Sequence, residues 1–163
     1  MPNAADTLIV YASNSGNTRY AAERIAEVLQ QQGRSVVVRD VAGMKPHELR
    51  GYPVVVFGSC TWERRTPEGK LEGQLPEHMH RFAGSAEHTK LPGARFAVFA
   101  LGRHEYTAFA GAANHLQVLV QRLGGELLLP PLKYDGFPQQ DPAPIDAWAA
   151  ELAVTIPERS AAR

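Results

Sequence analysis

Six polar residues between a short apolar run and a helical pattern have the composition of an anion-binding loop. The segment Ser13-Asn14-Ser15-Gly16-Asn17-Thr18 offers three hydroxyls, two amides and one glycine. Backbone N–H groups at the amino end of a helix point toward a bound anion, and Gly16 lets the backbone approach it closely. The pattern therefore favours the binding of a single phosphate group by neutral donors.

The same loop argues against two commoner phosphate sites. Its first cation is Arg19, so the lysine of the triphosphate motif G-x-x-x-x-G-K-[ST] has no counterpart here. The dinucleotide motif G-x-G-x-x-G does not occur either. An N-capping cluster that binds no ligand is the structural alternative. The order of strand, hydroxyl-rich turn and helix favours the ligand.

Two other polar connections each follow an apolar run and each contain an aromatic residue. Cys60–Gln74 contains Trp62, and Gly102–Thr107 contains Tyr106. Both are expected to leave the carboxyl ends of parallel strands, where open α/β sheets bind their ligands. Trp148, by contrast, falls on the apolar stripe of a predicted helix and is expected in the core.

These candidate loops need a sheet to position them, and the sequence predicts a parallel one. Several apolar runs are nearly continuous instead of alternating, which is typical of strands buried on both faces. The predicted strands are Thr7–Ala12, Ser35–Asp40, Pro53–Ser59, Arg95–Leu101 and Glu126–Leu132.

Helical patterns fill most of the gaps between these strands. Strands that alternate with helices predict right-handed crossovers and a doubly wound open sheet. The predicted helices are Asn17–Gln32, Leu75–Phe82, Phe109–Leu123 and Pro144–Val154, with a single turn at Pro46–Leu49.

The composition indicates one domain. The chain has 163 residues, of which 44% are hydrophobic, and we expect a single domain with its core at about 7–154 and a frayed tail at 157–163. Seventeen Lys and Arg balance seventeen Asp and Glu, which disfavours nucleic acid and anionic membranes as partners. One cysteine, no basic and apolar leader, and no run of about 18 apolar residues predict a cytoplasmic protein.

Three motifs in this order resemble the flavin-binding loops of short-chain flavodoxins. Ser13–Thr18 is similar to the family's phosphate loop, [ST]-x-[ST]-G-N-T. Gly58–Trp62 resembles its second loop, and Gly102–Tyr106 followed by Phe109–Ala112 resembles its third. The resemblance covers roughly Thr7 to Val154. It implies a flavodoxin-like three-layer α/β sandwich, with a five-stranded parallel sheet of order 2-1-3-4-5 and helices on both faces.

The resemblance also implies FMN as the cofactor and names the residues that bind it. Trp62 and Tyr106 are expected to sandwich the isoalloxazine ring, and backbone groups of the two loops to meet its polar edge. The implied phosphate-loop residues are Ser13, Asn14, Ser15, Gly16, Asn17 and Thr18. The implied ring-binding residues are Cys60, Thr61, Trp62, Glu63, Arg64, Leu101, Gly102, Arg103, Tyr106, Ala108, Phe109 and Ala110.

Three departures from the family pattern carry their own expectations. Glu63 stands where many members have glycine, and a side chain there hinders a peptide flip through φ > 0, so we expect a less stable one-electron-reduced state. Arg64, Arg65, Arg103 and His104 lie in loops that are usually acidic, so we expect a less negative potential. Cys60 is interpreted as a small buried side chain.

The implied function is that of a low-potential carrier that moves single electrons between a flavodoxin reductase and acceptor enzymes. Such a carrier, expected as a monomer, has no substrate turnover of its own, so no catalytic or metal-ligating residues are assigned. An FMN-dependent NAD(P)H oxidoreductase acting on quinone-like acceptors is the alternative. It needs an open flavin face, which a Trp–Tyr sandwich closes. A regulatory module without flavin is a third interpretation, which the phosphate loop disfavours.

Overall fold

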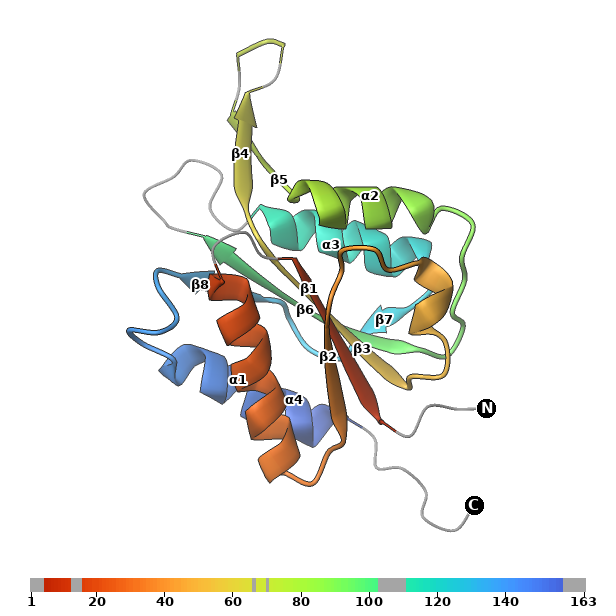
Figure 1. Cartoon of the computed structure of the whole chain (residues 1–163), viewed down its shortest axis with the longest axis vertical. Helices are drawn as coiled ribbons and strands as arrows, with labels where there is room; N and C mark the ends of the chain where they lie inside the picture. Colours follow the sequence, from red (N-terminus) through yellow and green to blue (C-terminus); the bar gives the residue numbers. More distant parts are fainter. Residues whose placement is uncertain (1–4, 13–15, 66, 70, 103–110, 157–163) are drawn as a thin grey trace.

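The computed structural model describes residues 5–12, 16–65, 67–69, 71–102 and 111–156, with the backbone alone for 62–65 and 71–74. Strands and helices alternate along most of this length (Figure 1). The strands are β1 (Thr7–Ala12), β2 (Val36–Asp40), β3 (Val54–Cys60), β4 (Trp62–Arg65), β5 (Leu71–Gln74), β6 (Arg95–Gly102), β7 (Glu126–Leu127) and β8 (Leu132–Asp135). The helices are α1 (Asn17–Gln31), η1 (Pro46–Leu49), α2 (Glu77–Ser85), α3 (Ala112–Arg122) and α4 (Ala143–Thr155).

The main sheet is parallel and has the predicted order. Its neighbours run β2-β1-β3-β6, and β6 pairs in turn with β7 and β8. If the strands of this sheet are numbered along the chain, the order across the sheet is 2-1-3-4-5. In this numbering β6 is the fourth strand, and β7 and β8 together form the fifth. The chain thus turns outward in both directions from β1, as in doubly wound folds.

Helices cover both faces of the sheet and enclose two separate cores. Helices α2 and α3 lie on one face, and α1 and α4 on the other (Figure 1). The first core includes Phe57, Phe96 and Leu116, all fully buried, and the second includes Ile25 and Phe99. Alternate residues of each central strand enter opposite cores, which is why these strands read as continuous apolar runs.

The fifth strand differs from the sequence expectation. A continuous strand over Glu126–Leu132 was predicted, whereas the structure has two short strands that both pair with β6. Pro130 and Pro131 separate them. Proline has no backbone N–H to donate to a ladder, so pairing stops at this point and resumes at Leu132.

The connection after β3 also differs. Cys60–Gln74 was predicted as a polar connection, but it contains an antiparallel ribbon in which β4 pairs with β5. The register sets Trp62 opposite Gln74 and Glu63 opposite Gly73. In Figure 1 the ribbon projects from the upper end of the sheet. Its charged, non-alternating sequence lacks the apolar period that identifies a strand.

The remaining elements agree with the predicted ones to within a few residues. Helix α2 begins two residues later than expected, after Pro76, and runs to Ser85. Trp148 is buried in the second core, as predicted, and its indole N–H donates to the carbonyl of Pro130 at 3.1 Å. Across the described ranges, none of the helices combines the length and apolar character that crossing a bilayer requires.

Candidate cofactor site

Three connections leave the sheet side by side at one edge. Ala12, the last residue of β1, is in register with Ser59 of β3, and Cys60 is in register with Leu101 of β6. The segments that follow β1, β3 and β6 therefore begin next to one another at the carboxyl ends of parallel strands. This is the edge at which open α/β sheets bind ligands, and all three predicted loops belong to it.

The first connection leads into α1 through a left-handed glycine. Gly16 has φ 86° and ψ −8°, a conformation that side chains rarely adopt, and its carbonyl accepts a hydrogen bond from the Tyr20 N–H at 2.9 Å. No atom lies within 4 Å of the position that a Cβ would occupy there. A side chain at Gly16 would thus meet open space, and the N–H groups of the first turn of α1 have no partner within the helix.

Thr18 supplies a polar atom that needs a partner. Its side chain is 1% exposed, and its hydroxyl oxygen has no hydrogen-bond partner among the described residues. A buried hydroxyl without a partner is costly, typically by about 1–3 kcal/mol. A phosphate at the start of α1 would accept this hydroxyl's hydrogen bond together with those of the first-turn N–H groups. The residues present therefore fit the phosphate of FMN.

The start of α1 favours an anion through its helix dipole, and the first cation along the helix, Arg19, is directed elsewhere. The first turn of α1 contains no acidic residue, so no carboxylate of that turn competes with an anion for the positive end of the helix dipole. The guanidinium of Arg19 points to Glu23 instead, at 2.8 Å, and this hydrogen bond raises the pKa of Arg19. The described part of the site is thus built from neutral donors, as the loop sequence predicts.

Hydrogen bonds tie the second connection to the third. The Thr61 N–H donates to the carbonyl of Leu101 at 3.1 Å, and the Thr61 hydroxyl accepts from the Ala112 N–H at 3.2 Å. Thr61 therefore joins the end of β3, the end of β6 and the start of α3. Cys60, predicted as a small buried side chain, is half-buried instead. It is the last residue of β3, at the carboxyl end of the strand.

A fourth connection joins this edge, which the sequence analysis did not include. The Gly136 N–H donates to the carbonyl of Gly102 at 3.0 Å, at the point where the third loop begins. The Tyr134 hydroxyl, from the end of β8, donates to the carbonyls of Asp141 at 2.7 Å and Phe137 at 3.2 Å. Burial, with Asp141 as a smaller cause, raises the pKa of Tyr134. The Tyr134 phenol thus braces the β8–α4 connection, and the Gly136 N–H ties that connection to the end of β6.

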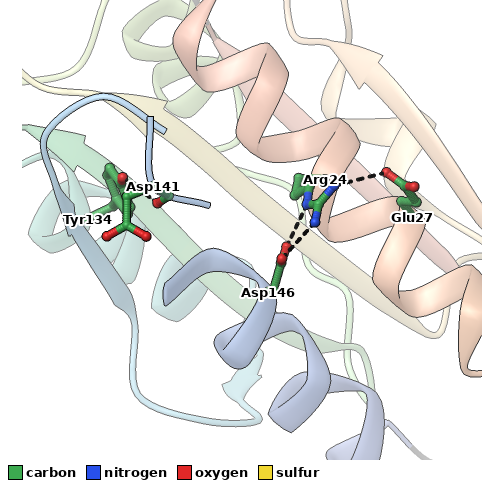
Figure 2. Close-up of polar contacts among 5 residues, drawn as sticks. All are labelled: Arg24, Glu27, Tyr134, Asp141 and Asp146. Carbon is green, nitrogen blue, oxygen red and sulfur yellow. Dashed lines mark hydrogen bonds and ion pairs between the residues drawn. The ribbon is translucent and has the colours of Figure 1, made fainter. Parts of the chain in front are cut away.

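An ion pair fixes α1, which carries the phosphate loop, against α4. Figure 2 shows the Arg24 guanidinium facing the Asp146 carboxylate, with Nε–Oδ1 at 2.7 Å and Nη2–Oδ2 at 2.8 Å. Glu27 lies 3.8 Å from the same guanidinium. The bidentate pair raises the pKa of Arg24. Since 122 residues separate the two partners in sequence, no local pattern could have identified this contact.

Part of the predicted site lies outside the described residues. For β4, which carries three of the predicted residues, the backbone alone is described. Cys60, Thr61, Leu101 and Gly102 lie together at the ends of β3 and β6, and the backbone of Trp62, Glu63 and Arg64 follows in β4. Gly16, Asn17 and Thr18 lie at the start of α1, which follows β1. Outside the description are Ser13, Asn14, Ser15, Arg103, His104, Tyr106, Ala108, Phe109 and Ala110, and the side chains of Trp62, Glu63, Arg64 and Arg65.

Comparison with known proteins agrees with this geometry. The model of the family described as Flavodoxin matches residues 9–148. A flavodoxin of Maridesulfovibrio salexigens is 32% identical over 151 residues, which cover 92% of this chain and 98% of that protein. The crystal structure of oxidised Flavodoxin 2 from Bacillus cereus superimposes with a TM-score of 0.78 at 30% identity, covering 93% of this chain and 97% of the other.

A larger enzyme also contains a similar segment. NADPH-dependent diflavin oxidoreductase 1 of Emericella nidulans is 30% identical over 128 residues. These residues cover 76% of this chain but 18% of that enzyme. The likeness is therefore to one part of the enzyme, whereas the flavodoxins match along nearly their whole length.

Proposed function

The chain belongs to the flavodoxin family, and from this premise we propose how its own residues hold the cofactor and meet a partner. The protein binds FMN and acts as an electron carrier between redox proteins. When bound, FMN supplies the redox chemistry, because its ring system accepts and releases electrons one at a time. Two observations carry the assignment of residues: the carboxyl ends of β1, β3 and β6 lie side by side, and the buried Thr18 hydroxyl in the first turn of α1 has no partner among the described residues.

In this proposal the segment Ser13–Thr18 binds the phosphate. The Thr18 hydroxyl donates to a phosphate oxygen, and the N–H groups of the first turn of α1 donate to the others. Gly16 keeps the backbone close to the anion because a left-handed residue with no side chain precedes the helix. Charge-assisted hydrogen bonds of this kind are shorter and stronger than neutral ones.

The two loops after β3 and β6 enclose the ring. We assign the two faces of the ring to Trp62 and Tyr106, since stacked aromatic rings gain about 0.5–1.5 kcal/mol beyond the area that they bury. Thr61, Glu63 and Arg64 in one loop, and Leu101, Gly102 and Arg103 in the other, line the ring's edge. Cys60 and the segment Ala108–Ala110 complete this shell.

The molecule's charge suggests the kind of partner. Arg64, Arg65, Arg103 and His104 occur in the loops assigned to the ring, while the whole chain has a formal net charge of zero. We propose that its reductase and acceptor enzymes present an acidic or weakly charged surface to these loops. The carrier is proposed to work as a cytoplasmic monomer made of a single domain, with the FMN edge as its contact surface.

Titration of the apoprotein with FMN and with riboflavin tests this assignment. The two ligands share the ring, but riboflavin lacks the phosphate. The proposal expects riboflavin to bind at least about 100-fold more weakly, since hydrogen bonds to charged groups contribute about 1.5–3 kcal/mol each. Equal affinities would contradict a phosphate site at Ser13–Thr18, and failure to bind either ligand would contradict the flavin site as a whole.

A further inference from the structure

An open cavity of about 490 Å³, exposed to solvent on one side, lies at the end of the sheet opposite the proposed cofactor site. Two turns line it, residues 49–53 between η1 and β3 and residues 90–94 before β6. These turns precede the amino ends of β3 and β6, whereas the proposed FMN site lies at the carboxyl ends. In Figure 1 both turns lie at the right, away from the β4–β5 ribbon. The volume falls in the range of small-ligand pockets, about 300–1,000 Å³.

The walls of this cavity are fixed in place by the backbone. Gly51 and Gly93 adopt left-handed conformations, with φ of 88° and 83°, and each stands in one of the two turns. The Arg95 N–H donates to the carbonyl of Pro53 at 3.0 Å, which joins the two turns at their exits. The Leu91 N–H donates to the carbonyl of Leu123 at 2.8 Å. Because the turns are tied to each other and to the end of α3, a ligand meets a cavity that is already formed.

The lining combines apolar surface with cations. Tyr52 is half-buried and packs against the first core, and Leu91 is buried beside it. Arg50 and Lys90 also line the cavity, whereas neither turn contains Asp or Glu. The Lys90 ammonium donates to the carbonyl of Arg122 at the end of α3, which holds its charge at the rim. An ammonium has three N–H groups, so donors remain for a ligand.

We propose that this cavity is a second binding site, which takes a small aromatic carboxylate. The ring would lie against Tyr52 and Leu91, and the carboxylate would face Arg50 and Lys90. A guanidinium pairs with a carboxylate through two N–H groups and also stacks on flat rings, and the apolar wall has no counterpart in a compact ion such as phosphate, so the lining favours an acid that carries an aromatic ring. The site is distinct from the flavin site because the two occupy opposite ends of the same strands.

Amide NMR on the full chain loaded with FMN tests the proposal. Benzoate supplies both the ring and the charge, benzamide the ring alone, and acetate the charge alone. We expect millimolar benzoate to shift the amides of 50–52 and of 90, 91, 93 and 94 along saturable curves. Benzamide and acetate should bind about tenfold more weakly or not at all. Since the cofactor site is filled, shifts that map to the loops after β1, β3 and β6 would overturn the proposal.

Single substitutions distinguish a specific binding site from nonspecific electrostatic attraction between benzoate and the protein surface. Arg50→Gln and Lys90→Gln should each weaken benzoate binding about three- to fivefold, as expected for partly exposed charge pairs. Lys133→Gln, at an exposed position of β8, should leave the affinity unchanged. The proposal fails if shifts grow linearly without saturation, if benzamide binds as well as benzoate, if inorganic phosphate competes as strongly, or if the control variant loses as much affinity.

Discussion

The Thr18 hydroxyl offers the most direct test of the proposed phosphate site, because it is buried and has no protein partner among the described residues. Thr18→Val removes the hydroxyl and preserves the shape. We expect the Kd for FMN to rise at least about tenfold, since a hydrogen bond to a charged group contributes about 1.5–3 kcal/mol. The apoprotein should lose no stability, because its hydroxyl makes no hydrogen bond there. Fluorescence titration and chemical denaturation measure the two quantities.

The chain offers a matched control. Thr7 has an equally buried and unpartnered hydroxyl, at the opposite end of β1. Thr7→Val should therefore leave the Kd for FMN unchanged. An equal loss of affinity in both variants would mean that the effect comes from packing, and would contradict a hydrogen bond from Thr18 to the phosphate.

Gly58 tests how closely the strands behind the site are packed. A Cβ built at this residue of β3 would lie 1.9 Å from the ring of Phe99, its register partner in β6. Because Phe99 is fully buried, Gly58→Ala must displace the ring, and we expect the free energy of unfolding to fall by about 1–3 kcal/mol. Gly84→Ala, in α2 with open space around it, should be neutral or stabilising by up to about 1 kcal/mol. Similar losses in both variants would contradict this account.

At the scale of elements, Glu48 links η1 to β2. Its carboxylate accepts hydrogen bonds from the Lys45 N–H at 2.7 Å and from Arg39 Nη1 at 3.0 Å. These bonds, the first more than the second, lower the pKa of Glu48 below its usual value of 4.5. A carboxyl whose pKa is lowered by folding stabilises the fold above its unfolded pKa, and this contribution is lost as the pH falls through its folded pKa.

Because folding lowers the pKa of Glu48, the contribution of Glu48 to the free energy of unfolding should depend on pH. Glu48→Gln should lower the free energy of unfolding at pH 7 by about 1 kcal/mol, the typical contribution of a hydrogen bond. The difference from the unaltered protein should shrink steadily as the pH is lowered below 4.5. Urea denaturation across this pH range measures it, with the exposed Glu151→Gln as control. A difference in the free energy of unfolding that stays constant with pH would contradict this account, because it would show that the stabilisation by Glu48 does not depend on the charge of its carboxylate.

The sequence predicted most of the elements because their signals are local. The central strands have long apolar runs, α1 has a clear apolar stripe, and α4 is apolar with its largest side chains at helical spacing, so their bounds agree to within two residues. The ribbon of β4 and β5 was missed because its residues are charged and do not alternate. The break in the fifth strand was missed because the apolar residues of 126–132 favour one continuous strand. Pro130 and Pro131, which cannot donate to a ladder, were the signal for the break.

The candidate site likewise has features with a local sequence signal and features that depend on long-range packing. Gly16 and Thr18 could be proposed from the sequence because the segment Ser13–Thr18 is continuous and has a distinctive composition. The ion pair of Arg24 with Asp146 and the contact of Gly136 with Gly102 depend on how distant segments pack. The half-burial of Cys60 likewise depends on the packing around the end of β3. Such features follow from the fold and leave no signal in a single sequence.

At the scale of the whole molecule, charge should govern the encounter with partners. Changing both Arg64 and Arg65 to Glu makes the β4 region acidic and shifts the formal net charge from zero to −4. If the reductase presents an acidic surface, association should slow by about tenfold or more at low salt, and added salt should reduce the effect. Stopped-flow kinetics measures the rate, with Arg81 and Arg122 changed to Glu as a control on α2 and α3. Faster association of the Arg64/Arg65 variant would contradict the proposed partner surface.

The central claim, that this chain is an FMN electron carrier, is tested most directly by stepwise anaerobic reduction of the purified protein, followed by its visible spectrum. The account predicts a yellow protein that takes up electrons in two separate one-electron steps. With NADH or NADPH alone it should stay oxidised until a reductase is added. Rapid oxidation of either nucleotide by the protein alone, with direct two-electron bleaching, would contradict the carrier and favour an enzyme that reduces small acceptors.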